Sequence, residues 1–194
     1  MSWLTIVLVC YVIGSLPTAY LMGRVTAGVD IRVSGDGNAG AANVYREVGH
    51  IPGIAVGVMD VGKGTLAVLI AGVLQPQQSF ALIGGAAAVM GHNWPLFLQL
   101  RGGRGAATTM GVLVALLPQV VFPLIVVAGV PFVLYRSVNL FFAFLYTPLP
   151  GVLWFLQYPG HMIWYAIALP LLVGVTHYLT TRGVHKPLQE PQPD

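Results

Sequence analysis

Seven apolar stretches follow one another along this chain, at 3–22, 51–74, 80–98, 105–117, 119–135, 139–158 and 162–180. Stretches of about 20 apolar residues match the thickness of the hydrocarbon core of a bilayer. Backbone amides find no water partner there, so each stretch must be helical to satisfy its hydrogen bonds. With 56% hydrophobic and only 8% charged residues, the composition disfavours a soluble domain. We therefore predict an all-α polytopic membrane protein.

The stretches 105–117 and 119–135 are short for a full crossing, so they form either one helix bent near Pro118 and Pro123 or two separate helices. The basic residues decide between these alternatives. With seven crossings and the N-terminus outside, all basic residues of the connections fall on one side, which the positive-inside rule makes cytoplasmic. We predict seven transmembrane helices, some of them short, with the N-terminus outside and the C-terminus cytoplasmic. The basic residues are Arg24, Arg32, Arg46, Arg101, Arg104, Arg136, Arg182 and Lys186.

Residues 1–186 are predicted to form a single membrane-embedded domain, followed by a Pro-rich, disordered tail at 187–194. The net charge of +3 comes without the basic cluster typical of nucleic-acid binding, so no nucleic-acid partner is expected. Cys10 is the one cysteine, which excludes a disulfide framework, and the five histidines lack metal-ligand spacing. We expect no metal site.

The longest polar interval, at 30–53, faces the cytoplasm in this topology. Glycines precede a predicted short interfacial helix at 40–49, and a glycine-rich turn that opens a helix presents free N–H groups to a phosphate. These glycines are Gly35, Gly37 and Gly40. The residues that share one face of the helix by their spacing are Asn43, Arg46, Glu47 and His50. A surface helix with a solvated charged face would carry the same pattern.

Two charged residues, Asp60 and Lys63, interrupt the second apolar stretch, one helical turn apart. Charges inside a membrane are costly, and the default interpretation is a functional role with a named partner. A purely structural ion pair is the alternative.

A second candidate anion site precedes the helix predicted at 105–117, where Arg101 and Arg104 flank two glycines. Just upstream, His92 and Asn93 are either ligand contacts or satisfied core residues. The last helix places His177 near its cytoplasmic end, where a histidine is also a common partner of the helix dipole. Four segments thus bring polar groups to one membrane face, which predicts a site for a phosphorylated small molecule beside a lipid-like partner.

Taken together, these segments resemble the bacterial acyl-phosphate:glycerol-3-phosphate acyltransferase family over nearly the whole chain. The resemblance implies a seven-helix enzyme of the bacterial inner membrane, with its active site on the cytoplasmic side. The motifs that carry it are Gly14-Ser-Leu-Pro17-Thr-Ala-Tyr20, the loop from Gly35 to Arg46, Asp60-Val-Gly-Lys63-Gly64, Gly91-His92 with Pro95, Gly102-Gly-Arg-Gly105, and His177.

The implied reaction moves a fatty acyl group from acyl phosphate to the 1-hydroxyl of glycerol 3-phosphate, giving lysophosphatidic acid and phosphate without a cofactor. A substrate phosphate would accept the hydroxyl proton, and loop amides would polarise the acyl carbonyl or hold the leaving phosphate. A soluble enzyme that produces acyl phosphate is a further candidate partner. The catalytic positions implied are Arg46, Arg104, His177, Asn38 and Asp36. The substrate-binding positions implied are Gly35, Gly37, Gly40, Asn43, Asp60, Lys63, His92, Asn93, Gly102, Gly103, Gly105 and Thr180.

The sequence departs from the family pattern at four positions, with Asp36 for Ser, Ala42 for Thr, Arg104 for Lys and Thr180 for Asn. Asp36 matters most, because its charge would oppose an anionic ligand unless Arg32 or Arg46 neutralises it. A non-catalytic or altered-substrate paralogue acting as an assembly subunit is therefore the alternative function. A transporter of phosphorylated metabolites fits less well, because the predicted outer connections are short and neutral.

Overall fold

A computed structural model describes residues 2–181, and all regular secondary structure in that range is helical, with no strand. Six helical segments of the described chain are long and apolar enough to cross a membrane. The prediction of an all-α polytopic membrane protein is therefore confirmed. The tail predicted at 187–194 lies outside the described residues, and the single domain over 1–186 stays a prediction.

The described chain contains ten α-helices and one 3-10 helix. They are α1 (Trp3–Gly14), α2 (Thr18–Ala27), α3 (Ala41–Glu47), α4 (His50–Leu74), α5 (Gln78–Asn93), η1 (Leu96–Leu98), α6 (Ala106–Leu116), α7 (Pro118–Tyr135), α8 (Val138–Tyr146), α9 (Leu149–Phe155) and α10 (Gly160–Thr181).

Prolines divide three of the predicted stretches into two helical pieces each. Pro17 separates α1 from α2, Pro95 separates α5 from η1, and Pro148 separates α8 from α9. Proline lacks the N–H that a helix interior needs, and its ring clashes with the preceding turn. Apolar content alone predicted continuous helices at 3–22, 80–98 and 139–158, and the breaks correct that picture.

The two short stretches form separate helices, α6 and α7, which meet at Leu117. With 11 residues, α6 is about 16 Å long at about 1.5 Å per residue. That length falls well short of the roughly 30 Å hydrocarbon core. The break at Leu117 excludes a single bent helix. Because α6 is so short, the count of seven crossings stays a prediction.

Small residues allow the central helices to approach closely. A Cβ added to Gly64 of α4 would collide with the backbone carbonyl of Thr108 in α6, and one added to Gly111 of α6 would collide with that of Val61. A Cβ added to Gly14 of α1 would likewise collide with the backbone carbonyl of Ala88 in α5. Interfaces of this kind are typical of helix packing in membranes, where apolar burial provides little drive between helices.

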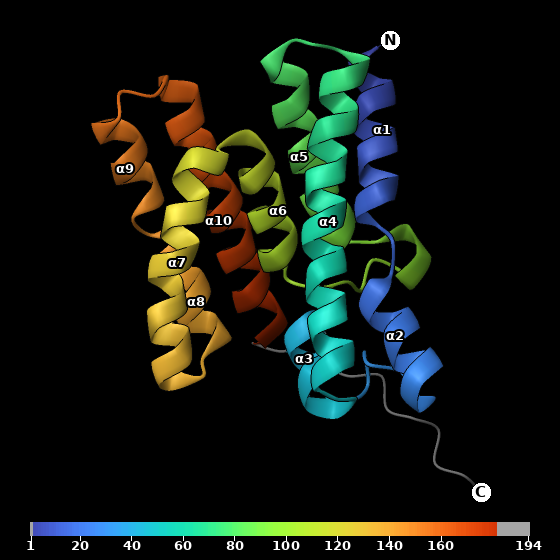
Figure 1. Ribbon diagram of the computed structural model, residues 1–194. Helices are drawn as coiled ribbons and strands as arrows, with labels where there is room; N and C mark the ends of the chain where they lie inside the picture. The colour runs from blue at the N-terminus through green and yellow to red at the C-terminus, as the bar shows by residue number, and fades with distance from the viewer. Residues whose placement is uncertain (1, 182–194) are drawn as a thin grey trace, which may run out of the picture.

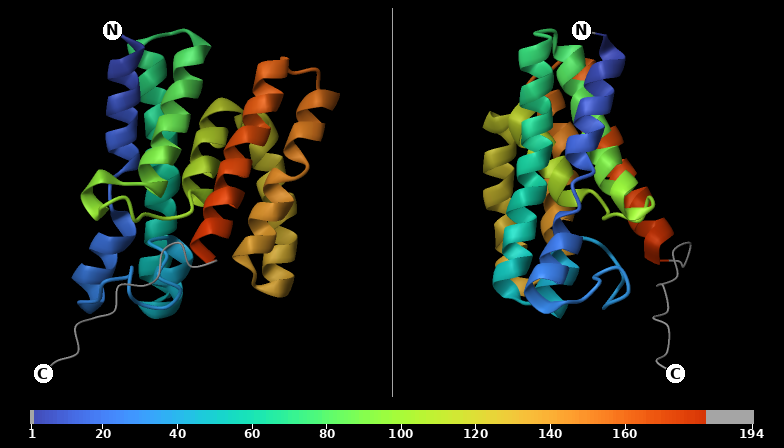
Figure 2. Two further views of the ribbon diagram at one scale, coloured as in Figure 1. Left: turned by 180° about the vertical axis from the view of Figure 1, so that it is seen from behind. Right: turned by 90° about the vertical axis from the view of Figure 1, so that its right-hand side faces the viewer.

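The N-terminus and the polar loop between α2 and α3 lie at opposite ends of the bundle (Figure 1). Both α5 and α6 are shorter than α4, and the connection between them lies partway along α4 in all views (Figures 1 and 2). This connection, which carries Arg101 and Arg104, therefore lies within the half of the bundle that faces the polar loop.

Candidate active site

The side chain of Asn43 holds the polar loop between α2 and α3 in place through hydrogen bonds to its backbone. Its buried side chain donates to the carbonyl oxygens of Ile31 (3.1 Å) and Ser34 (2.9 Å) and accepts from the amide of Asp36 (3.3 Å). A side chain on Gly35, whose φ is 59°, would collide with Asn43. Asn43, predicted to bind substrate, thus uses its polar atoms to hold the loop.

The helix that follows the loop is shorter than predicted. α3 ends at Glu47, and the chain turns at Gly49, whose φ of 145° suits glycine. His50 therefore begins α4 and stacks on Tyr45 with a centroid distance of 4.4 Å. The prediction that His50 shares a face with Asn43 and Arg46 is wrong, because the turn ends the helical register.

Two arginines from different segments converge on Asp36. Its Oδ2 lies 3.1 Å from Nη2 of Arg46 in α3 and 3.3 Å from Nη2 of Arg104 in the α5–α6 connection. His177, in the last turns of α10, lies within electrostatic range of Arg104 and Asp36. We call Asp36, Arg46, Arg104 and His177 the cationic cluster. The structure brings the first three of these sequence-predicted residues into contact, and the charges of Arg104 and Asp36 act on the fourth.

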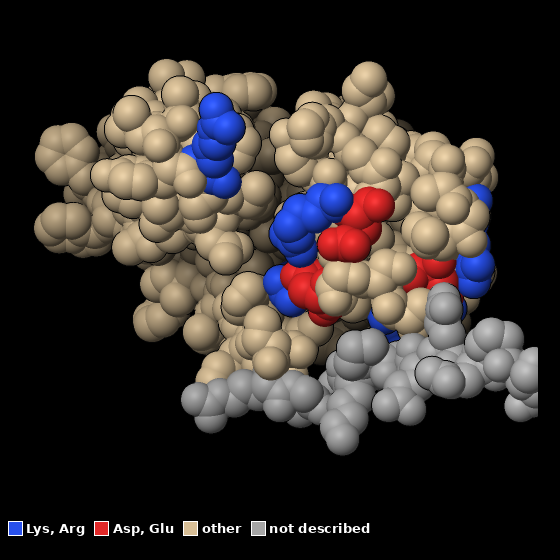
Figure 3. Space-filling view, turned by 90° about the horizontal axis from the view of Figure 1, so that it is seen from below, with Lys and Arg blue, Asp and Glu red and all other residues tan. Residues whose placement is uncertain are grey.

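The cluster lies at the polar end of the bundle. Figure 3 shows basic and acidic side chains gathered side by side on that face. Within the cluster, the side chain of Arg46 is 51% exposed and that of Arg104 only 16%. The buried Nε of Arg104 has no hydrogen-bond partner, so this guanidinium retains donor capacity beyond its contact with Asp36.

Arg32 does not neutralise Asp36, contrary to one of the two expectations. It pairs with Asp30 instead, donating from Nε (3.0 Å) and Nη2 (2.7 Å), and lies over the Tyr20 ring. Hydrogen bonds from Arg32 hold the pKa of Asp30 below its usual value, against the opposing effect of burial. Arg46, the other candidate, does contact Asp36.

The glycine amides are mostly engaged within the protein. Gly102 donates to Asn93 O (3.2 Å) and Gly103 to His92 O (3.1 Å). In the polar loop, Gly37 and Gly40 donate to the carbonyls of Ser34 and Asn38. In this structure these four amides are engaged within the protein, and anion binding by the glycine-rich segments stays a prediction. Glycine is required at 102 and 103 because any Cβ would collide with the end of α5.

Asp60 and Lys63 form the ion pair that their spacing suggested, with Nζ and Oδ1 2.9 Å apart and both side chains buried. Thr18 donates to Asp60 (2.6 Å), and Lys63 donates to the carbonyl of Leu16 (3.1 Å) beside the α1–α2 break. His92 Nδ1 lies 3.6 Å from Asp60. This geometry favours a structural ion pair. Substrate contact by Asp60, Lys63 and His92 stays a prediction.

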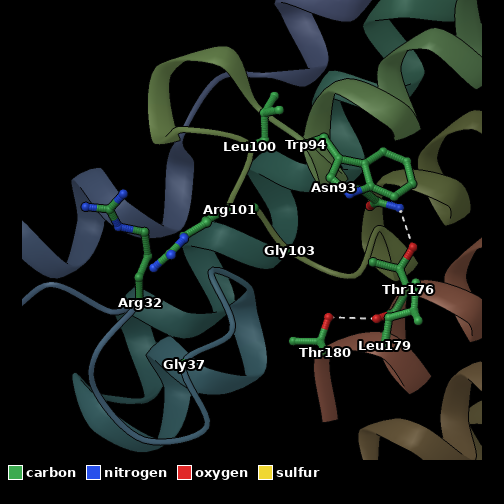
Figure 4. Close-up of a pocket in the computed structure, with 11 residues that line it drawn as sticks. Arg32, Gly37, Asn93, Trp94, Leu100, Arg101, Gly103, Thr176, Leu179 and Thr180 are labelled. Atoms are coloured by element: carbon green, nitrogen blue, oxygen red, sulfur yellow. Dashed lines mark hydrogen bonds between the residues drawn. The ribbon is translucent and has the colours of Figure 1, made fainter. Parts of the chain in front are cut away.

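A hollow opens between the polar loop, the α5–α6 connection and the end of α10 (Figure 4). In the wall of this hollow, Asn93 Nδ2 of α5 donates a hydrogen bond to Thr176 Oγ1 of α10 (3.0 Å). The Oδ1 atom of Asn93 is buried and has no hydrogen-bond partner. Gly105, at φ 81°, lies against that oxygen. The lining residues are Arg32, Gly37, Asn93, Trp94, Leu100, Arg101, Gly102, Gly103, Thr176, Leu179 and Thr180.

Among the lining residues, Arg101 belongs to the candidate anion site predicted from the sequence, whereas Trp94, Leu100, Thr176 and Leu179 were not assigned to any site. Arg32 and Arg101 add two cations to the hollow, and Trp94, Leu100 and Leu179 give it an apolar side. One signal was available: Thr176 lies one helical turn before the predicted Thr180, so the two share a face of α10. Nothing local to the sequence marked Trp94 or Leu100.

Comparisons with known proteins give consistent results. A family model described as glycerol-3-phosphate acyltransferase matches residues 4–184. Glycerol-3-phosphate acyltransferase 4 of Dehalococcoides mccartyi is 38% identical over 183 residues, which cover 92% of this chain and 97% of the relative. The glycerol-3-phosphate acyltransferase of Halalkalibacterium halodurans is also 38% identical, over 89% of this chain and 86% of its own.

Solved structures agree in fold. The crystal structure of PlsY (YgiH), an integral membrane glycerol 3-phosphate acyltransferase in its glycerol 3-phosphate form, matches with a TM-score of 0.84 at 30% identity, covering 95% of this chain and 92% of that one. Fold and similarities define this protein as an integral membrane acyltransferase. The chain belongs to the glycerol-3-phosphate acyltransferase family. Its activity is acyl transfer to glycerol 3-phosphate, in phospholipid synthesis.

Proposed function

We propose that the acyl donor is an acyl phosphate, that the acceptor is the 1-hydroxyl of glycerol 3-phosphate, and that the cationic cluster binds their phosphates. The convergence of Arg46 and Arg104 on one carboxylate oxygen carries this proposal. Guanidinium groups recognise carboxylate and phosphate oxygens with the same donor geometry. A pair that holds Asp36 is therefore also suited to a phosphate.

In the proposed reaction, the 1-hydroxyl oxygen attacks the carbonyl carbon of the acyl phosphate, and the bond between that carbon and the phosphate oxygen breaks. Inorganic phosphate leaves, and a phosphate oxygen accepts the hydroxyl proton. The donor is a reactive mixed anhydride, so positioning and charge stabilisation by Arg46, Arg104 and His177 can supply much of the catalysis. Asn38, buried beside the cluster with a free Oδ1, would help to orient the acceptor.

None of the cluster residues lines the hollow, but Gly37 and Gly103, which adjoin Asp36 and Arg104 in the chain, do. The apolar side of the hollow therefore supports a place for the acyl chain near the phosphates. Leu100 and Leu179 are exposed, and Trp94, the residue after α5, also lines the hollow (Figure 4). Polar head and apolar tail of a single substrate would thus lie on adjacent walls, as is usual for small-molecule sites. Arg101, on the same lining, would add positive charge near the head.

The active site would lie on the cytoplasmic side of a bacterial inner membrane, with the N-terminus outside and seven crossings. This orientation is supported by the basic residues at the end of the bundle that holds the polar loop and the α7–α8 turn. A cytoplasmic site would receive glycerol 3-phosphate from solution and acyl phosphate from the bilayer or from a soluble enzyme that produces it.

The test is phosphate release from palmitoyl phosphate by the purified protein, with and without glycerol 3-phosphate. Release should depend on the acceptor and fall at least about 100-fold in Arg46→Ala and Arg104→Ala, since lost donors to developing charge cost about that much. Arg136→Ala is the matched control, because this exposed arginine lies in the α7–α8 turn. Acceptor-independent release, or equal losses in all three variants, would contradict the proposal.

A further inference from the structure

Asp36 occupies the position between the two arginines that the proposed function gives to a phosphate. A single oxygen, Oδ2, contacts both guanidinium groups, at 3.1 Å to Arg46 and 3.3 Å to Arg104. A phosphate oxygen entering the cluster would need those same donors. The carboxylate and the ligand are therefore alternatives for one position, and this inference rests on the proposed function.

Electrostatics favours replacement of Asp36 by the phosphate over binding of both to the arginines. Two guanidinium groups and one carboxylate leave a net charge of +1 within the trio, and a dianionic phosphate beside an ionised Asp36 would meet direct repulsion. A bound phosphate thus gains most when Asp36 leaves the arginines. Because the Asp36 side chain is 37% exposed, it can leave toward solvent without becoming a buried, unpaired charge.

The side chain of Asp36 can leave the arginines while Asn43 holds the backbone of the loop through the Asp36 amide. Asp36 is flanked by Gly35 and Gly37, both at positive φ (59° and 69°), and glycine allows backbone conformations closed to other residues. The second oxygen, Oδ1, accepts from the amide of Asn38 (3.2 Å). This local bond does not depend on the charge of Asp36, so an asparagine at position 36 can retain it.

We propose that Asp36 is an intramolecular competitor that sets the affinity of the cationic cluster for phosphate. Substrate binds only the fraction of molecules in which Asp36 has left the arginines, and its observed affinity is lowered by that fraction. The same factor applies to every phosphate that uses the cluster, including the inorganic phosphate released by the reaction. Asp36 therefore weakens substrate binding and product retention together.

The experiment measures binding of inorganic phosphate and of glycerol 3-phosphate to the full-length protein in detergent, by calorimetry at low ionic strength. Asp36→Asn and Asp36→Ser should both bind the two ligands about tenfold more tightly than the unmodified protein, the size expected for two partly exposed ion pairs. The control is Glu47→Gln, which removes the charge of an exposed carboxylate next to Arg46 in the chain and should leave both affinities within about twofold. Thermal unfolding verifies that each variant is folded.

Distinct outcomes overturn distinct statements. Unchanged or weaker phosphate binding in both Asp36 variants overturns the competitor role, as does an equal gain in Glu47→Gln. Tighter phosphate but weaker glycerol 3-phosphate binding also overturns it, because Asp36 would then contact the glycerol part instead of competing with the phosphate. If Arg46→Ala binds phosphate as well as the unmodified protein does, the proposed function of the cluster fails first.

Discussion

The amide of Gly103 donates a 3.1 Å hydrogen bond to the carbonyl oxygen of His92. The space that a Cβ on Gly103 would need is filled by Nε2 of the same histidine. This contact fixes the α5–α6 connection to the end of α5 one residue before Arg104. The position of an arginine in the cationic cluster thus depends on a glycine that need not touch substrate.

Gly103→Ala should lower acyl transfer at least tenfold, because the added methyl group must displace His92 or move the connection that carries Arg104. A shift of about 1 Å at a catalytic group can cost about 100-fold in rate. Gly62→Ala in α4 is the control, since a Cβ there meets nothing within 4 Å, and its activity should be unchanged. Normal activity of folded Gly103→Ala would show that the connection is not fixed by this contact.

Lys63→Met should lower the free energy of unfolding by about 3–5 kcal/mol, because it leaves the buried carboxylate of Asp60 without its 2.9 Å partner. The double variant Asp60→Asn/Lys63→Met should recover most of that loss, since neither charge remains. Unfolding in mixed detergent micelles measures both. Acyl transfer that returns along with stability in the double variant would assign the pair a structural role. Stability without activity would support the predicted substrate contact instead.

Thr176→Val should destabilise the protein by about 1–3 kcal/mol, because Asn93 Nδ2 loses its 3.0 Å acceptor in a buried position. Replacing both partners, as in Asn93→Leu/Thr176→Val, should cost less than the sum of the single changes. Thr181→Val, at an exposed position of the same helix, is the control for helix propensity. Thermal unfolding of the unmodified protein, Asn93→Leu, Thr176→Val and the double variant gives the coupling energy, and a value near zero would contradict a link between α5 and α10 through this bond.

Asp30→Asn should lower stability at pH 7 and have no effect at strongly acid pH. The hydrogen bonds from Arg32 lower the folded-state pKa of Asp30, so ionised Asp30 stabilises the fold above its unfolded pKa of about 3.9. That contribution is lost as the pH falls from about 4 through the lower folded pKa. Melting temperatures of the two proteins should therefore differ at pH 7, by the equivalent of about 1.5–3 kcal/mol, and converge below pH 4. A difference that persists at the acid end would mean that charge is not its source.

The sequence predicted several residues of the site but not which of them contact one another. Arg46, Arg104 and His177 could be named because charged and titratable residues stand out in an apolar chain. The partner of each arginine could not, since Arg32 is nearer to Asp36 along the chain than Arg46 is, yet Arg46 is the one that contacts it. The structure assigns Arg32 to Asp30 and adds Arg104 from a distant segment. Glycines were harder to interpret, because an anion-binding amide and a close backbone contact require the same residue.

Local chemistry decided the apolar stretches and the supply of cations at one end of the bundle. These are properties of single residues and short windows, since a bilayer demands helices wherever about 20 apolar residues occur. The tertiary structure alone decided which prolines break a helix, since Pro123, Pro131 and Pro170 lie inside helices. It also decided that Gly102 and Gly103 use their amides inside the protein and that Asp36 holds two arginines. Such outcomes depend on distances between segments far apart in the chain, which no window of sequence contains.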